Sequence, residues 1–150
     1  MPTSPETLTR ISAFLASHST LSLATVAANG RPLAASLFFV SDAALNVYWI
    51  SGPNSRHSVN LAQRPRVALT VHNATWTWTE IAGVQMEGSV AIVAAGPAWQ
   101  AAWERYLLKF PFVQDFQAEV SRSNFYVFTP DWVRLVDNKL GFGHKEELNI

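Results

Sequence analysis

The chain has 150 residues, of which 49% are apolar and only 15% are charged, so we expect one folded domain over residues 1–150 with one sizeable core. Eleven basic residues balance eleven acidic ones. This formal net charge of zero argues against nucleic acid as a partner, because binding to a phosphate backbone draws its affinity from Lys and Arg. The absence of cysteine excludes disulfides, thiolate nucleophiles and cysteine-based metal sites.

The N-terminal residues MPTSPETLTR carry neither the basic start nor the apolar run of a signal peptide. Apolar stretches elsewhere are much shorter than the roughly 18 residues that a membrane-spanning helix requires. We therefore expect a cytoplasmic protein without a membrane partner.

The first third of the chain predicts a helix followed by an antiparallel meander. Ser4 is the expected N-cap, Pro5 suits the first helical position, and apolar residues recur at helical spacing from Leu8 to Leu15. The Asn29-Gly30 dipeptide is a strong hairpin signal, because both residues tolerate positive φ. The expected strands are 21–28, 33–40 and 45–51.

The middle of the chain predicts a short helix and two more strands. Ser55 is the expected N-cap of a helix that reaches about Gln63, and the strands are expected at 66–73 and 81–93. Between these strands, three threonines alternate with Trp76 and Trp78, which suggests a further strand or an exposed hairpin.

The last third predicts helices and then late strands. Gly96-Pro97 begins a helix with an apolar stripe that contains Trp99 and Trp103, and Pro111 separates it from a second helical piece. The segments NFYVFTP and WVRLVD are expected strands, and LGFGHKEELNI is expected to be a turn and a frayed C-terminus. The order of elements indicates an α+β, mainly β fold, most simply a small barrel with helices on its outside.

Ser51, Ser55, Arg56 and His57 form the most distinctive polar cluster, between the end of an expected strand and the start of an expected helix. The first turn of a helix presents free N–H groups and a partial positive charge, and these side chains add hydrogen-bond donors that suit a phosphate. The alternative is a purely structural role, in which Ser55 caps the helix while Arg56 and His57 face solvent.

Gln85 and the tail from Asp137 to Lys145 are the other candidate site residues. Gln85 lies in mid-strand, and its amide can donate and accept, as the edge of a heterocycle requires. Alternatively, Gln85 faces water beside Glu87. The tail combines hydrogen-bonding groups with an aromatic ring and two glycines that permit close backbone approach. It lacks the third glycine and the βαβ unit of a dinucleotide-binding fingerprint, which excludes a Rossmann fold.

The sequence contains no G-x-S-x-G elbow, P-loop or H-E-x-x-H motif. The four histidines lie far apart in the sequence, so we expect no metal site, and no catalytic residue can be assigned. An enzyme of this composition would depend on a cofactor for its chemistry. Trp76 and Trp78, if they are exposed, suggest a partner surface or a pocket wall.

Several segments together resemble the pyridoxamine 5′-phosphate oxidase-like superfamily of FMN-binding split β-barrels. They are LATVAANGRPLAAS, VYWISGPNSRHSVNLAQRPRVAL and GVQMEGSV. The closing VDNKLGFGHKEEL, with YLLKFPFVQDF upstream of it, is similar to the YhbP-like branch of that superfamily. The likeness covers nearly the whole chain and implies a six-stranded antiparallel split β-barrel with peripheral helices.

The resemblance also implies a homodimer with two FMN sites at the subunit interface. Ser51, Ser55, Arg56 and His57 would hold the FMN phosphate, and Gln85 would reach the flavin ring from its own subunit or from the other one. The return strand would offer backbone groups to the flavin edge, and the C-terminal segment would close the pocket. The residues implied in these two segments are Ala35, Ser36, Leu37, Asn138, Gly141, Phe142 and Gly143.

The sequence departs from family members that oxidise pyridoxamine phosphate. The strand AASLFFV carries no basic side chain, and no arginine follows Arg134, so we do not expect that activity. The leading hypothesis is an FMN-dependent oxidoreductase that acts on a small substrate or electron donor. The alternatives are a flavin carrier or sensor without turnover, the same barrel binding haem or a deazaflavin, and a dimer with a purely structural role.

Overall fold

The computed structural model describes residues 4–150, and Met1–Thr3 of the N-terminal segment discussed above lie outside the described residues. One antiparallel sheet dominates it, in the strand order β2-β1-β5-β6-β7-β4-β3 with β8 also paired to β7. The strands are β1 (Thr20–Val26), β2 (Pro32–Phe38), β3 (Val40–Ser41), β4 (Val47–Ser51), β5 (Arg66–His72), β6 (Ala82–Ile92), β7 (Asn124–Asp137) and β8 (Lys145–Asn149).

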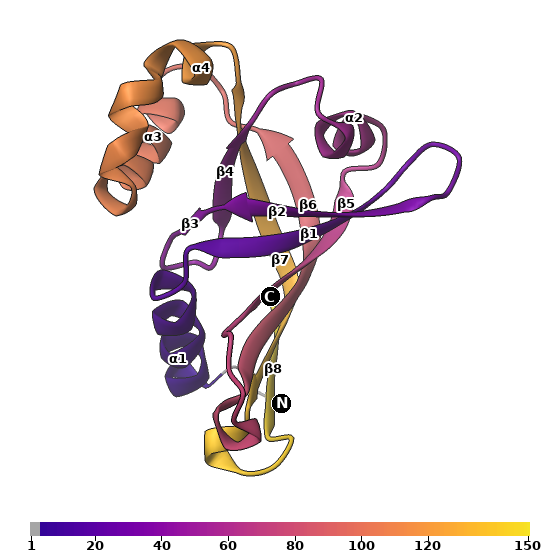
Figure 1. Cartoon of the computed structure of the whole chain (residues 1–150), viewed down its shortest axis with the longest axis vertical. Coiled ribbons are helices and arrows are strands. Elements are labelled where there is room, and N and C mark those ends of the chain that lie inside the picture. The colour runs from indigo at the N-terminus through magenta and orange to yellow at the C-terminus, as the bar shows by residue number, and fades with distance from the viewer. Residues whose placement is uncertain (1–3) are drawn as a thin grey trace.

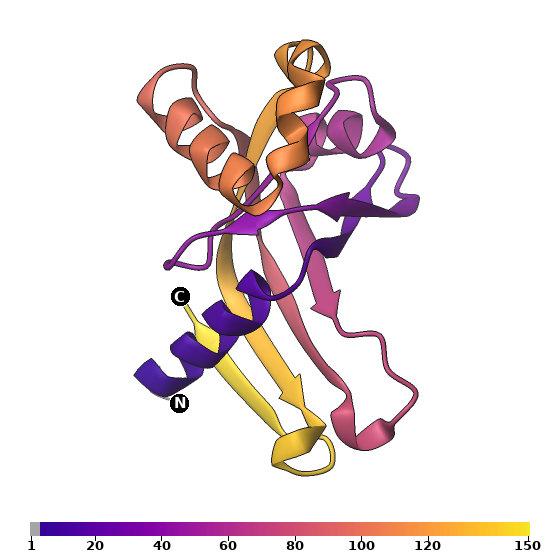
Figure 2. The same cartoon turned by 60° about the vertical axis from the view of Figure 1, so that its left-hand side comes forward.

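The four α-helices of the described residues lie outside the curled sheet, as Figures 1 and 2 show. They are α1 (Pro5–Ala16), α2 (Arg56–Gln63), α3 (Pro97–Lys109) and α4 (Gln117–Ser121), with short 3-10 turns η1 (Trp78–Glu80), η2 (Pro111–Phe116) and η3 (Asn138–Leu140). The expected α+β split barrel with peripheral helices is therefore confirmed, although the sheet within residues 4–150 has eight strands rather than six. None of the helices in residues 4–150 is both long and apolar enough to cross a membrane.

The long strand β7 corrects the expectation of two separate late strands. A register shift between Glu87 and Gly88 pairs Gly88 with Pro130 and Glu87 with Trp132, so Asp131 is an extra residue in β7. Such a bulge tolerates Pro130, which has no N–H to donate to the ladder. The strand therefore passes through the Thr129–Asp131 region, and its two halves pair with different neighbours, β4 and β8.

Three local expectations are wrong for identifiable reasons. The C-terminal residues are not frayed, because β8 pairs with β7 and buries Leu148. The Thr/Trp alternation at 75–79 lies in the exposed loop that joins the antiparallel strands β5 and β6 and contains η1, so the alternative of a further strand is wrong there. Ser4 precedes α1, but its side chain makes no capping hydrogen bond. The residue that favours the start of this helix is therefore Pro5, at its first position.

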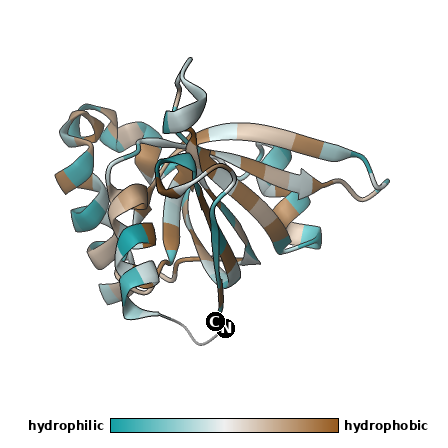
Figure 3. Cartoon of the chain, turned by 90° about the horizontal axis from the view of Figure 1, so that it is seen from below, coloured by the Kyte–Doolittle hydropathy of each residue, from teal (hydrophilic) through white to brown (hydrophobic). Residues whose placement is uncertain are grey.

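The core consists of two clusters of buried apolar side chains. Figure 3 shows apolar and polar residues following one another along the strands, which is the pattern of a sheet with one buried face. Trp49, Phe39 and Phe128 are fully buried in the larger cluster, which α1 covers. A smaller cluster joins α3 to β7 through Tyr106 and Phe125. The expected stripe of α3 is thus confirmed, with Trp99 and Trp103 partly buried against this cluster.

Glu146 in β8 is the acidic centre of a polar network that joins the C-terminal strand to α1. Its carboxylate accepts hydrogen bonds from Thr7 Oγ1 at 2.6 Å and from Arg10 Nη2 at 2.7 Å, and His144 Nε2 lies 3.1 Å away. The bonds from Arg10 and then Thr7 lower the pKa of Glu146 to about 2. The network therefore ties the two ends of the described chain together through a charged group that is mostly shielded from water.

We expect Glu146→Gln to lower the free energy of unfolding at neutral pH by about 1–3 kcal/mol, because the amide cannot replace a carboxylate that pairs with Arg10. The folded-state pKa is depressed, so the stabilisation is present above the ordinary carboxyl pKa and is lost as the pH falls toward about 2. Urea unfolding between pH 7 and 2 should show that slope in the natural chain and a reduced slope in the variant. Glu147→Gln, which removes an exposed pair with Arg134, is the control and should change stability by under about 1 kcal/mol.

Candidate functional site

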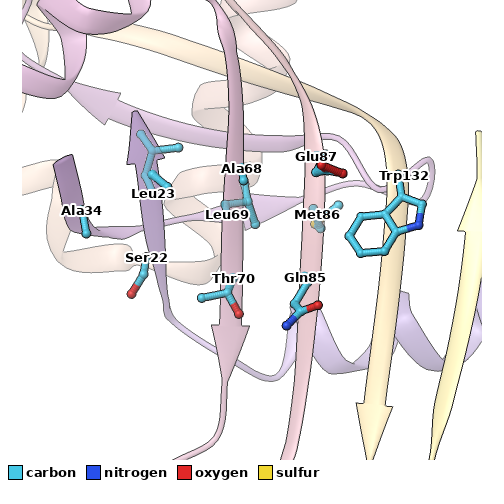
Figure 4. Close-up of a pocket in the computed structure, with 11 residues that line it drawn as sticks. Ser22, Leu23, Ala34, Ala68, Leu69, Thr70, Gln85, Met86, Glu87 and Trp132 are labelled. Carbon is cyan, nitrogen blue, oxygen red and sulfur yellow. The ribbon is translucent and has the colours of Figure 1, made fainter. Parts of the chain in front are cut away.

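The outer face of the sheet carries a groove of about 440 Å³ that crosses β1, β2, β5, β6 and β7. Ser22, Thr70 and Gln85 lie side by side on its floor (Figure 4). The lining residues are Ser22, Leu23, Ala24, Ala34, Ala68, Leu69, Thr70, Gln85, Met86, Glu87 and Trp132, and those on β1, β2 and β5 that face outward (Ser22, Ala24, Ala34, Ala68 and Thr70) all have short side chains. A face built from such short side chains allows another molecule to approach the backbone closely.

The strand register sorts these side chains into two rows across the sheet. The pairs Ser22–Ser36, Ser22–Thr70, Thr70–Gln85 and Gln85–Arg134 make one polar row. A second row lies two residues away from the first on each strand and consists of three alanines followed by an acid and an indole. Its members, in sheet order, are Ala34, Ala24, Ala68, Glu87 and Trp132. Side chains alternate between the two faces of a strand, so both rows point outward.

The α2 N-terminus lies at the end of β4 and gathers three of the four expected phosphate ligands. His57 Nε2 lies 2.8 Å from Ser51 Oγ and 3.2 Å from Ser55 Oγ. Ser55 also caps α2, since its hydroxyl oxygen accepts a hydrogen bond from the backbone N–H of Ser58. Ser55 therefore caps α2, as the structural interpretation predicts, and also belongs to the polar cluster with Ser51 and His57.

Arg56 and His57 differ in their surroundings. Partial burial lowers the pKa of His57 below its ordinary value, so the imidazole is neutral at neutral pH. The Arg56 side chain is exposed at the first position of α2. A guanidinium stays protonated in proteins, so Arg56 is the permanent positive charge beside the three clustered side chains.

Strand β2 is one edge of the sheet and pairs only with β1 in the described structure. Backbone groups along the free edge of β2 are therefore not used by a strand ladder in the described structure. Ala35 and Leu37 are half-buried and turn toward the core, whereas Ser36 is exposed on the same outer face as Ala34.

The expected C-terminal site residues lie elsewhere. Asn138 donates from Nδ2 to the carbonyl oxygen of Trp78 at 2.8 Å and accepts from the backbone N–H of Gly143 at 2.9 Å. Gly141 and Gly143 adopt φ of 133° and 67°, and Phe142 between them is exposed. This loop lies at the end of the sheet remote from α2 (Figures 1 and 2). Within one chain the structure therefore separates these residues from Ser51, Ser55 and His57.

Reasoning from the sequence missed most of the groove floor. Ser22, Ala68 and Thr70 carry no reactive group and match no motif, so nothing singled them out before the strands were placed. A usable signal was the alternation of small with large apolar residues in LSLA and ALTV, which leaves one strand face shallow. In residues 4–150, no three His, Asp or Glu side chains lie close enough together to hold a metal ion.

A curled antiparallel sheet with helices outside it and a polar cluster where one strand meets a helix defines a split-barrel protein. The chain belongs to the pyridoxamine 5′-phosphate oxidase family, whose model matches residues 8–137.

Other proteins are similar to this chain over most of its length. A UPF0306 protein of Yersinia pseudotuberculosis is 31% identical over 143 residues, covering 94% of this chain and 92% of its own. Two solved structures share the fold at low identity. The heme-binding protein of Mycobacterium smegmatis has a TM-score of 0.78 at 20% identity, covering 99% of this chain and 59% of its own. HutZ, the heme storage protein of Vibrio cholerae, has a TM-score of 0.71 at 20% identity, covering 81% of this chain and 88% of its own.

Proposed function

We propose that this protein binds FMN between two copies of the chain and uses it as an oxidoreductase for a small substrate or electron donor. The observation that carries the proposal is the cluster of Ser51, Ser55 and His57 at the N-terminus of α2, with the charge of Arg56 beside it. Hydroxyl, imidazole and guanidinium groups at a helix N-terminus are a donor set that suits a phosphate monoester.

The residues present fit the phosphate end of FMN. The serine hydroxyls can rotate away from His57 and donate to phosphate oxygens, and the first turn of α2 offers backbone N–H groups. Bound FMN would supply hydride or electron transfer, while these residues fix its phosphate. The exposed edge of β2 at Ala35–Leu37 would orient the ring through backbone groups, and Gln85 would contact it with an amide.

A second copy is part of the proposal because the candidate residues do not converge in one chain. Gln85 and Ser36 occupy the same row but are three strand spacings apart, which is roughly 14 Å. The loop with Asn138, Gly141 and Gly143 lies at the opposite end of the sheet from α2 (Figures 1 and 2). In a homodimer, the groove face and this loop of one subunit can complete the phosphate site of the other.

Haem is the second candidate ligand, and an observation on β5 favours it. His72 is exposed at the end of the strand, paired with Gly83, on the same outer face as Thr70. Its Nδ1 lies 2.9 Å from the carbonyl oxygen of Asn73, a contact that fixes the proton on Nδ1 and leaves Nε2 free to act as a ligand. Binding without turnover, as a carrier or sensor, is the corresponding functional alternative.

An absorption spectrum of the freshly purified protein, with mass spectrometry of the released ligand, tests these candidates directly. One equivalent per chain of a yellow chromophore with the mass of FMN is the expected result. A Soret band and the mass of haem would replace the flavin by the second candidate. A colourless protein that also fails to bind added FMN would overturn the flavin proposal. Anaerobic titration of the flavin-loaded protein with NADH and NADPH then separates an oxidoreductase from a carrier.

The pH dependence of FMN binding should report on His57. Burial lowers the pKa of His57, and a phosphate favours the protonated imidazole, so His57 should take up a proton when FMN binds at a pH between about 7.5 and about 5.5. The phosphate itself loses charge near pH 6, so affinity should fall more steeply with falling pH in His57→Gln than in the natural chain. Fluorescence titration of FMN at several pH values measures the two slopes, with His18→Gln as the control on a histidine that packs against Phe14. An unchanged slope in His57→Gln would remove His57 from the phosphate site.

A further inference from the structure

A cleft of about 360 Å³ lies between α3 and α4, at the end of the molecule that also carries α2 (Figures 1 and 2). Two indole rings and three polar side chains line it, together with the buried side chain of Val120. The lining residues are Trp99, Gln100, Trp103, Gln117, Val120 and Ser121. None of them belongs to the phosphate cluster at α2 or to the groove on the sheet, so the cleft is separate from the site proposed above.

The two indole rings form a fixed aromatic surface on α3. Trp99 and Trp103 are four residues apart and share one face of the helix, and their rings stack with centroids 5.8 Å apart and an interplanar angle of 16°. Phe125 holds this pair in place, because its ring meets Trp99 edge to face at 5.5 Å. Both indoles are only partly buried. A partly exposed aromatic surface of this kind favours a planar ring as ligand, because planar rings stack on it.

The polar side chains on α4 supply complementary hydrogen-bonding groups. Gln117 and Ser121 are four residues apart in this helix, so both line the cleft from one face. The Gln117 side chain is exposed, and its carboxamide can donate and accept at the same time. The Ser121 hydroxyl donates to the carbonyl oxygen of Ala118 at 2.7 Å, which leaves its oxygen as an acceptor. The cleft therefore suits a ring whose edge carries an N–H donor beside an acceptor.

Adenine is the ring that fits this combination. Its N6 amino group donates and its N7 accepts, and a glutamine carboxamide pairs with both at once. The second hydrogen of N6 suits the acceptor at Ser121, whereas the O4 carbonyl of uracil would place one acceptor against another. The charged residues nearest in sequence are Glu104, Glu119 and Arg122, and none of them lines the cleft. A neutral lining favours the base itself over a charged group.

We propose that the cleft between α3 and α4 binds the adenine group of a nucleoside or nucleotide. The indole surface stacks on the base, Gln117 pairs with its N6–N7 edge, and Ser121 Oγ accepts from N6. The site is additional to the proposed FMN site and requires neither the flavin nor a second copy of the chain. Adenosine, adenosine monophosphate and NADH share this base, so their relative affinities identify the natural source.

Isothermal titration calorimetry of the purified protein with adenosine tests the cleft. The natural chain should bind adenosine with a dissociation constant below about 1 mM, and at least about 10-fold more tightly than uridine. D-glucose is the second comparison ligand, because aromatic rings and carboxamides also bind sugars, and it should not bind. Absence of adenosine binding at millimolar concentration would overturn the proposal. Equal affinity for uridine, or binding of glucose in place of adenosine, would also overturn it.

Substitutions locate the binding in the cleft. Gln117→Leu should weaken adenosine binding at least about 10-fold, because leucine has a similar size and cannot hydrogen-bond. Gln117 is exposed, so this variant should keep the unfolding midpoint of the natural chain. Gln114→Leu is the matched control, because Gln114 is an exposed glutamine of η2 outside the cleft, and its affinity should be natural. Trp103→Leu should also lose at least about 10-fold in affinity through lost stacking. Unchanged affinity in Gln117→Leu would overturn the proposal.

The three adenine ligands separate the possible sources. Equal affinities for all three identify the nucleoside portion as the whole recognised group, and at least about 10-fold tighter binding of NADH identifies a dinucleotide. Either pattern supports the adenine site, provided that Gln117→Leu weakens binding of all three. FMN affinity is measured separately and should be the same in Gln117→Leu as in the natural chain. An empty flavin site with adenosine bound in the cleft would therefore overturn only the flavin proposal.

Discussion

Arg56→Ala should weaken FMN binding by about 1.5–3 kcal/mol, or roughly 10- to 100-fold in the dissociation constant. The reason lies in the charges around α2. Burial lowers the pKa of His57, so the neighbouring imidazole contributes no charge at neutral pH, and Arg56 is the fixed cation at the first position of the helix. Loss of the guanidinium would leave a dianionic phosphate with hydroxyl groups, a neutral imidazole and backbone N–H groups alone.

Isothermal titration or flavin fluorescence measures this change, and Arg122→Ala provides the control. Arg122 is exposed just after α4 and forms no ion pair in the described part of the chain, so its loss should leave affinity unchanged. Arg56→Lys should recover part of the affinity, because the charge returns without the bidentate geometry. Equal affinity of Arg56→Ala and the natural chain would remove Arg56 from the site.

Gly88→Ala should destabilise the fold by about 3 kcal/mol, the largest effect expected for a single methyl group in this chain. Gly88 faces the bulge of β7, where a Cβ atom would overlap the Thr129 carbonyl oxygen and approach Pro130 Cα to 2.9 Å. Both atoms belong to the backbone, so relief requires the two central strands to separate. The expected fall in the unfolding midpoint is about 6–12 °C.

Gly52→Ala is the control for this prediction. A Cβ atom at Gly52 would meet no atom within 4 Å, and its φ is not in the left-handed region. Its stability should therefore stay within about 0.5 kcal/mol of the natural chain in thermal or urea unfolding. Similar midpoints for the Gly88→Ala and Gly52→Ala variants would show that the bulge relaxes freely.

Periodicity predicted most of the fold because its helices and inner strands have one strongly apolar face. The Asn29-Gly30 turn, the Ser55 cap and the Gly96-Pro97 start lie where local chemistry expects them, and Gly30 has φ of 86°. The predictions that failed concern segments whose structure depends on residues far away in the sequence. The tail after Gly143 becomes a strand only because β7 offers it an edge. Pro130 ends no strand because Gly88 opposite it leaves room for a bulge.

The residues of the candidate site also divide into those that the sequence predicted and those that it did not. Ser51, Ser55 and His57 could be found because they are close in sequence, and the distances between them confirm that they form one cluster. Most of the groove floor was missed, because Ser22 and Thr70 become neighbours of Gln85 only through strand register.

The shared use of β7 has a consequence for biosynthesis. Val47–Ser51 pairs with residues 124–128, so some 75 residues separate the two strands, and the same late segment also pairs with β6 and β8. While a ribosome is still translating residues 124–149, β4 and β6 have exposed edges, and the core lacks the buried side chains of β7 and β8, among them Phe125, Phe128 and Leu148. Such edges are prone to self-association. The N-terminal half of this protein should therefore depend on chaperones until the last strands emerge from the exit tunnel.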